Sequence, residues 1–219
     1  MTEKKKKTIG IYIYDQAEVL DFAGPFEVFS TAGRLLRSRT DNKSAAEEND
    51  LDVLLIAQST DRLVQARGGF PVQATCSIQN HPQPLDVLVV VGGVHMAEME
   101  KKDVTDWIAK QHVTTEITAS VCTGAFLLAK AGILAEGTCV TTHWEDAADL
   151  QQQFQHLKVV TEQRWVDTGR IVTSGGISAG IDMALHLVRR LYSLELAQST
   201  ARQMEFDWTR PDADEEGEK

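Results

Sequence analysis

Short apolar runs alternate along this chain with longer segments in which apolar and polar residues mix at helical spacing. Residues 8–14 and 85–91 are nearly continuous runs of β-branched, aliphatic and aromatic residues. Such runs predict buried strands, the second of them central in a parallel sheet. Further strands are predicted at residues 51–57, 114–121, 138–142 and 158–160, and hairpins at residues 63–78 and 164–174.

Helices are predicted between these strands. The first is expected to begin at Gly24-Pro25, because proline suits the first helical turn. Ser178 is expected to cap a helix that continues to Tyr192. Others are predicted at residues 97–112, from Cys122 to a stop at Gly132, and at residues 144–154 and 194–206. Alternating strands and helices predict the α/β class, here a three-layer sandwich with a mostly parallel central sheet.

One domain is expected to span residues 8–207, since 219 residues suit a single α/β core. Residues 1–7 are mostly charged and are predicted to be a disordered start. Residues 38–50 are polar and predict an exposed insertion, and residues 208–219 form an acidic tail. Ligand sites in such sheets lie at the carboxyl ends of strands, which directs attention to the loops after them.

Charge and cysteine content narrow the class of protein. A net charge of −10 argues against nucleic acid as the main partner, because phosphate binding needs a clustered basic face. Three cysteines without a signal peptide indicate free thiols in a reducing cytoplasm. The apolar runs are too short for a membrane span. A small-molecule substrate is therefore the expected partner, with no nucleic acid and no membrane.

No cofactor and no metal are expected. The cysteines and histidines show no metal-ligand spacing. The glycine-rich stretch at residues 174–180 runs from a strand into a helix, but it lacks the spacings typical of dinucleotide and phosphate-binding loops.

Cys122 lies where a predicted strand turns abruptly into a helix of small and apolar residues. A nucleophile on such a strand-to-helix turn has the nucleophile-elbow arrangement. The unpaired N–H groups and the helix dipole at this position stabilise a thiolate, so the pKa of Cys122 is expected to fall below its free value. The alternative is a buried structural cysteine that fits a tight turn.

Two other side chains are candidates for proton transfer or substrate contact. Asp21 lies among apolar residues, so its carboxyl must be hydrogen-bonded, paired or protonated. It is either a general acid/base beside the thiol or the N-cap of the following helix. His143 is the histidine expected nearest the site, although a lone histidine more often serves as a hydrogen-bonding residue of the core or surface.

Gly92 and Gly93 follow the predicted central strand. Their backbone N–H groups, together with that of Thr123, could form an oxyanion hole. A plain tight turn is the alternative, because a single Gly-Gly pair is weak evidence.

Several stretches in one order resemble the ThiJ/PfpI superfamily, and within it the isonitrile hydratases. They include Ser-Val-Cys-Thr-Gly at residues 120–124, Thr-Thr-His-Trp at 141–144 and Gly-Gly-Ile-Ser-Ala-Gly-Ile-Asp at 175–182. The resemblance implies a flavodoxin-like fold of the class I glutamine amidotransferase type and a homodimer. It also implies hydration of isonitriles to N-substituted formamides.

The resemblance assigns roles residue by residue. Cys122 matches the nucleophile, Asp21 the acidic partner of the hydratase type, and Thr123 the residue after the nucleophile. Gly93 and Thr123 match backbone oxyanion donors, and Ile177 a residue packed near the nucleophilic turn. The protease-like branch has histidine where this chain has Thr123, which argues against peptidase activity.

Two alternatives to the hydratase interpretation stay open. Glyoxalase-like members carry glutamate where this chain has Asp21, yet a glyoxalase-like enzyme for small α-oxoaldehydes is a second hypothesis. The third is a redox or ligand sensor without turnover, in which Cys122 oxidises.

Overall fold

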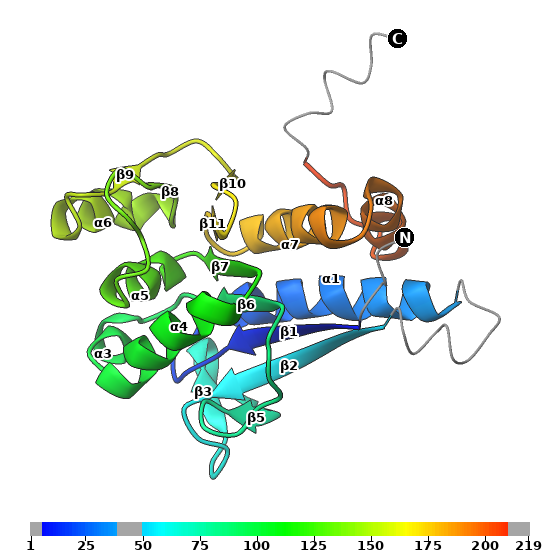
Figure 1. Ribbon diagram of the computed structural model, residues 1–219, viewed down its shortest axis with the longest axis horizontal. Helices are drawn as coiled ribbons and strands as arrows, with labels where there is room; N and C mark the ends of the chain where they lie inside the picture. Colours follow the sequence, from blue (N-terminus) through cyan, green and yellow to red (C-terminus); the bar gives the residue numbers. More distant parts are fainter. Residues whose placement is uncertain (1–5, 39–49, 210–219) are drawn as a thin grey trace, which may run out of the picture.

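The computed structural model describes residues 6–38 and 50–209 (Figure 1). A seven-stranded sheet forms its centre, in the order β10-β11-β7-β6-β1-β2-β5. All neighbouring strands are parallel except β10 and β11, which form an antiparallel hairpin. The strands are β1 Lys7–Tyr12, β2 Leu51–Ala57, β5 Cys76–Ser77, β6 Val87–Val90, β7 Ile117–Val121, β10 Trp165–Asp167 and β11 Ile171–Ser174.

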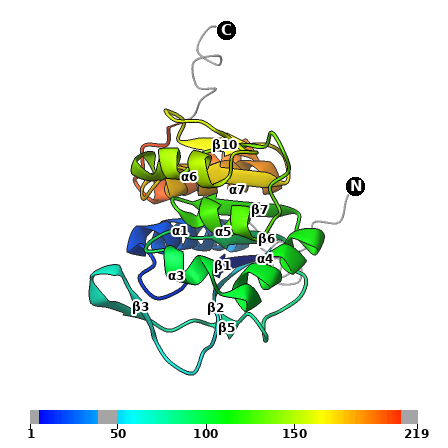
Figure 2. The ribbon, with the colours of Figure 1, turned by 90° about the vertical axis from the view of Figure 1, so that its left-hand side faces the viewer.

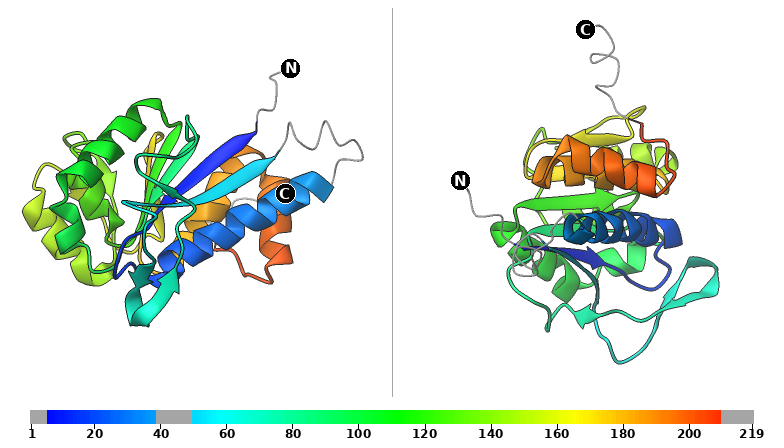
Figure 3. Two further views of the ribbon diagram at one scale, coloured as in Figure 1. Left: turned by 90° about the horizontal axis from the view of Figure 1, so that it is seen from below. Right: turned by 90° about the vertical axis from the view of Figure 1, so that its right-hand side faces the viewer.

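Helices cover both faces of this sheet (Figure 3). On one face α1 (Val19–Ser38), α7 (Ala179–Leu191) and α8 (Leu194–Gln203) pack against one another. On the other lie α3 (Met96–Met99), α4 (Lys102–Thr114) and α5 (Gly124–Lys130). Every residue of β6 and β7 is buried, as the apolar runs predict for central strands. The predicted three-layer α/β sandwich is confirmed.

Several short strands and helices lie outside the seven-stranded sheet. The strands β3 (Val64–Ala66) and β4 (Phe70–Val72) form an antiparallel hairpin that projects from the body of the molecule (Figure 2), with a 3₁₀ turn, η1 (Arg67–Gly69), at its tip. Beyond α5, β8 (Cys139–Val140) pairs in parallel with β9 (Lys158–Val159). Between them lie η2 (Trp144–Asp146) and α6 (Ala147–Gln153).

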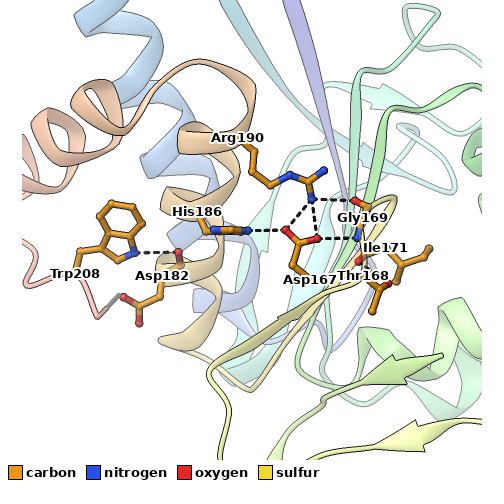
Figure 4. A network of polar contacts seen from close by, with 8 residues as sticks. All are labelled: Asp167, Thr168, Gly169, Ile171, Asp182, His186, Arg190 and Trp208. Atoms are coloured by element: carbon orange, nitrogen blue, oxygen red, sulfur yellow. Dashed lines mark hydrogen bonds and ion pairs between the residues drawn. The ribbon is translucent and has the colours of Figure 1, made fainter. Parts of the chain in front are cut away.

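Polar contacts fasten the β10–β11 hairpin to α7 (Figure 4). Arg190 donates to both carboxylate oxygens of Asp167, at 2.9 and 2.8 Å, and to the carbonyl of Gly169 at 2.9 Å. His186 Nε2 lies 2.6 Å from Asp167 Oδ2. The antiparallel edge of the sheet is therefore tied to a helix on its face.

The first helix begins earlier than the sequence predicts. α1 starts at Val19 instead of Gly24, and Pro25 lies inside it. Proline has a helical φ but no N–H, so the helix continues with one backbone hydrogen bond fewer. The N–H of Glu18 donates to the carbonyl of Gly92 at 3.0 Å, which directs the chain into the helix. The consequence is that Asp21 lies in the first turn of α1.

Three further expectations need correction. The helix predicted at residues 97–112 is broken into α3 and α4, where buried Glu98 accepts hydrogen bonds from Tyr12 at 2.5 Å and Lys101 at 2.8 Å. The hairpin predicted at residues 63–78 ends at Val72, because β5 joins the main sheet beside β2. Ser178 precedes α7, but its side chain does not cap the helix; its hydroxyl accepts from Arg164 at 3.3 Å.

The predicted insertion at residues 38–50, the start at 1–7 and the tail at 208–219 lie almost entirely outside the described residues. Within the described part of the chain, no helix combines the length and apolarity needed to cross a membrane.

Candidate active site

Cys122 forms the predicted elbow between β7 and α5. Its φ of 55° is in the left-handed region, which non-glycine residues rarely adopt. The strained turn is held by hydrogen bonds: its N–H donates to the carbonyls of Ser174 and Gly175, both at 3.2 Å, and its carbonyl accepts from the Thr142 hydroxyl at 2.8 Å. Backbone strain of this kind is typical of functional sites.

Glycines allow the elbow to approach the neighbouring strand. A Cβ on Gly124 would lie 2.1 Å from the carbonyl oxygen of Val90, and one on Gly92 would lie 2.5 Å from the backbone nitrogen of Thr123. Neither space admits a side chain. These two glycines therefore let the end of β6 lie directly against the nucleophilic turn.

Asp21 is completely buried and joins three segments. One carboxyl oxygen accepts from the N–H of Gly92 and the other from the N–H of Ile177, both at 3.1 Å. The carboxyl also lies close enough to the Cys122 thiol for the two groups to influence each other's pKa. The N-cap alternative for Asp21 is therefore wrong, since its side chain bonds to distant loops and not to its own helix.

The electrostatics of this pair differ from the sequence expectation. Burial raises the pKa of Asp21 to about 7. The two backbone N–H groups act to lower this pKa, but the effect of burial is larger. Burial also raises the pKa of the Cys122 thiol, and the charge of Asp21 adds to this effect. The thiol is only 7% exposed. Desolvation thus outweighs the N–H of Thr123 and the helix terminus, so the resting thiol holds its proton.

The glycine loop and Thr123 are bonded to each other. The N–H of Gly93 donates to the Thr123 hydroxyl at 2.9 Å, and that hydroxyl donates to the carbonyl of Gly93 at 3.0 Å. The backbone N–H of Thr123 acts to lower the pKa of the Cys122 thiol, against the larger effect of burial. The structure therefore brings together the groups that were predicted as oxyanion donors, with the N–H of Gly93 engaged by a hydroxyl.

His143 and Ile177 border the same space. Ile177 has a φ of 57°, and its N–H is one of the two that hold Asp21. His143 Nε2 lies 3.4 Å from Glu145, while its buried Nδ1 has no hydrogen-bond partner among the described residues. All the site residues predicted from the sequence thus converge at the carboxyl ends of β6, β7 and β11.

A cavity of about 250 Å³ opens above the thiol. Four charged side chains of its wall were missed by the sequence analysis, because they come from three segments that lie far apart in the sequence. Arg67 comes from the tip of the projecting hairpin and lies 3.2 Å from Glu18. The full lining consists of Glu18, Arg67, Gly93, Val94, Cys122, Thr123, His143, Glu145, Asp146 and Ile177.

Metal binding finds no support in the described residues, which contain no group of three or more histidine, cysteine, aspartate or glutamate side chains placed to hold an ion. Cys76 and Cys139 are free and partly exposed, and neither lines the cavity.

Comparison with known proteins defines the family. The sequence model of the DJ-1/PfpI family matches residues 7–190. The chain belongs to the DJ-1/PfpI family. The likeness to the ThiJ/PfpI superfamily inferred from the motifs is thereby confirmed.

Relatives within the DJ-1/PfpI family differ in kind. An isonitrile hydratase from Pseudomonas putida is 31% identical over 199 residues, which cover 90% of this chain and 78% of that protein. The HTH-type transcriptional regulator GbdR from Pseudomonas aeruginosa is 29% identical over 70% of this chain but only 41% of the regulator. A crystal structure of a ThiJ/PfpI family protein from Pseudomonas syringae has a TM-score of 0.78, with 24% identity, over 95% of this chain and 78% of that one. Family membership alone therefore allows both enzymes and regulators.

Proposed function

We propose that this protein hydrates an isonitrile to the corresponding N-substituted formamide, with Cys122 as the nucleophile and Asp21 as the proton carrier. The observation that carries the proposal is the fully buried Asp21 carboxyl, which interacts electrostatically with the Cys122 thiol beside a cavity and has no cation on it among the described residues. A carboxyl whose pKa is about 7 can both accept and donate a proton near neutral pH. The similarity to an isonitrile hydratase supports the substrate class.

In the first half of the reaction, the sulfur of Cys122 attacks the terminal carbon of the isonitrile. Asp21 takes the thiol proton and delivers it to the same carbon. A carbon–sulfur bond and a carbon–hydrogen bond form, which gives a thioimidate bound to the enzyme. The raised pKa of the thiol is compatible with this step. The reason is that one carboxyl, that of Asp21, both removes the proton from sulfur and delivers it to carbon.

In the second half, water adds to the thioimidate carbon while Asp21 takes a proton from the water and passes it to nitrogen. The tetrahedral intermediate then collapses, the carbon–sulfur bond breaks and the hydroxyl proton returns to sulfur. The products are the formamide and the free thiol, so atoms and charges balance. The N–H of Thr123 and the Gly93 loop border the reacting carbon and are proposed to stabilise the intermediate.

A turnover assay tests this function. Wild type, Cys122→Ala and Cys139→Ala are incubated with cyclohexyl isonitrile, and formamide is followed by chromatography. Formamide production by wild type and Cys139→Ala but not by Cys122→Ala would support the proposal, because Cys139 does not line the cavity. Absence of turnover by folded wild type would contradict it; lactate formation from methylglyoxal that requires Cys122 would then favour the glyoxalase-like function.

The sensor hypothesis is less well supported by the geometry. Peroxide reacts with thiolates, and burial raises the pKa of Cys122. We also propose a homodimer, as the family resemblance implies; its mass can be measured by light scattering.

A further inference from the structure

The wall of the Cys122 cavity carries more carboxylates than cations. Glu18, Glu145 and Asp146 line it, and the one arginine among the lining residues, Arg67, is paired with Glu18 at 3.2 Å. Among the described residues, the basic group paired with Glu145 is the imidazole of His143, at 3.4 Å. Two carboxylates are therefore left without a permanent cation in the described wall.

Asp146 lines the cavity and does not cap its own helix. It occupies the N-cap position of α6, yet its side chain makes no capping hydrogen bond. The negative charge of Asp146 acts on Cys122. Together with burial and the charge of Asp21, it raises the pKa of the thiol. A positive charge that entered the cavity would offset this contribution.

The entrance also has an apolar side. Val94 and Ile177 are exposed on the cavity wall, whereas Trp144, which is 75% exposed, lines an adjoining hollow that shares His143 and Ile177 with the cavity. Apolar side chains next to carboxylates suit organic cations, because the alkyl groups pack on the apolar side chains while the charge meets the carboxylates. The same surroundings repel an anion.

We propose that the Cys122 cavity selects small substrates that carry a positive charge, such as an alkylammonium or quaternary ammonium substituent, over anionic ones, with Glu145 and Asp146 as the residues that determine this preference. The inference rests on the proposed function for the reacting group, an isonitrile, and adds the substituent that accompanies it. Binding of the cation also favours loss of the thiol proton, so the substrate would help to activate its own nucleophile.

The preference can be measured without turnover, by labelling Cys122 with thiosulfonate reagents of opposite charge. In each reaction the sulfur forms a disulfide with the reagent and methanesulfinate leaves. The rate with the trimethylammonium-ethyl reagent is divided by the rate with the sulfonato-ethyl reagent, and peptide mass spectrometry confirms that Cys122 is the labelled site. The same ratio for 2-mercaptoethanol corrects for intrinsic reactivity.

At low ionic strength the corrected ratio is expected to exceed ~10 and to fall as salt is added, because charges at a solvent-accessible entrance are screened over ~10 Å at 0.1 M salt. The double variant Glu145→Gln/Asp146→Asn is expected to bring the corrected ratio to within ~3-fold of one. Arg67→Gln is expected to raise it. Glu136→Gln, an exposed carboxylate that does not line the cavity, controls for net charge and is expected to leave it unchanged. A wild-type ratio near one, or a ratio unaffected by the double variant, would overturn the inference.

Turnover separates this inference from the proposed function. Three isonitriles are compared by kcat/KM: cyclohexyl isonitrile, 2-isocyanoethyl-trimethylammonium and isocyanoacetate. No turnover of any of them, with the labelling ratio preserved, would contradict hydration but support charge selection. Equal turnover of all three, with a labelling ratio near one, would support hydration and contradict charge selection.

Discussion

Asp21 and Asp182 occupy equivalent places in two helices and have different surroundings. Each lies in the first turn of its helix, α1 or α7, and each is 0% exposed. Asp182 binds the guanidinium of Arg164 and accepts from the N–H of Thr209 at 3.0 Å. Its carbonyl accepts from the indole N–H of Trp208, as Figure 4 shows. Asp21 has two backbone N–H groups and a thiol instead.

The difference shows how partners decide the role of a buried carboxyl. Burial raises the pKa of both groups, but at Asp182 the charge of Arg164 works against this effect. Because the charge of Asp182 is compensated by Arg164, this pair holds the first turn of α7 to the β9–β10 loop. Without a cation, Asp21 has a pKa of about 7 and can exchange its proton with the neighbouring thiol. Equal burial therefore gives a structural group in one case and a proposed catalytic group in the other.

The largest expected effect is on turnover. Asp21→Asn keeps the shape of the side chain and an oxygen to accept one N–H, but it cannot carry the proton. General acid–base catalysis contributes ~10²–10⁴-fold, so the isonitrile turnover of Asp21→Asn should fall by that factor. Asp182→Asn is the matched control and is expected to change kcat less than ~3-fold, because it does not contact the cavity. Undiminished turnover in Asp21→Asn would remove Asp21 from the mechanism.

The pH dependence of stability is the next largest effect. Between pH 3.8, the ordinary pKa of the group, and about 7, the folded protein keeps the proton of Asp21 while the unfolded chain releases it. The free energy of unfolding therefore falls as pH rises through this window, by on the order of 4 kcal/mol, and then levels off. Urea unfolding of wild type and Asp21→Asn at pH 4, 6 and 8 measures it. A difference between the two proteins that does not change with pH would contradict the raised pKa.

Asp182→Ala tests the other side of the comparison. It leaves the N–H of Thr209 and the guanidinium of Arg164 without their acceptor, and we expect a loss of about 1–3 kcal/mol of unfolding free energy. The loss is moderated because the Arg164 side chain is 38% exposed and can turn to water. Urea unfolding at pH 7 measures it, and Asp182→Asn should lose less, since its amide oxygen still accepts. Unchanged stability in Asp182→Ala would show that the pair is not structural.

The smallest effect is expected at Asp167, a partly exposed carboxylate with two basic partners (Figure 4). Burial acts to raise the pKa of Asp167, but His186, the N–H of Gly169 and Arg190 lower it overall. Ion pairs near solvent contribute little, so Asp167→Asn should lose at most ~1 kcal/mol, and less at high salt. Urea unfolding at two salt concentrations tests this. A loss larger than that of Asp182→Ala would contradict the ranking by burial.

Much of the fold was predictable from local pattern. The apolar runs at β1 and β6 identified buried strands, the second of them central, and the abrupt change of composition at Cys122 identified the elbow. Gly132, which has a φ of 71°, ends its helix as predicted. These features depend on neighbours in sequence, so the sequence displays them directly.

The start of α1 and the break between α3 and α4 were not predictable in this way. Contacts between residues far apart in the sequence lie beside both places: Gly92 receives the N–H of Glu18, and Tyr12 donates to Glu98 within α3. The same is true of the charged wall of the cavity, where Arg67 meets Glu18 across 49 positions of the sequence. Local propensity carries no information about such pairs.

By itself, the sequence determined the α/β class, the parallel core strands, the strand-to-helix turn at Cys122 and the candidates around it. Only the tertiary structure decided that Asp21 reaches the thiol, that the thiol keeps its proton, and that carboxylates dominate the entrance. The physical reason is that periodicity and turn chemistry act between near neighbours, whereas a pKa depends on desolvation and on every charge that folding brings within reach.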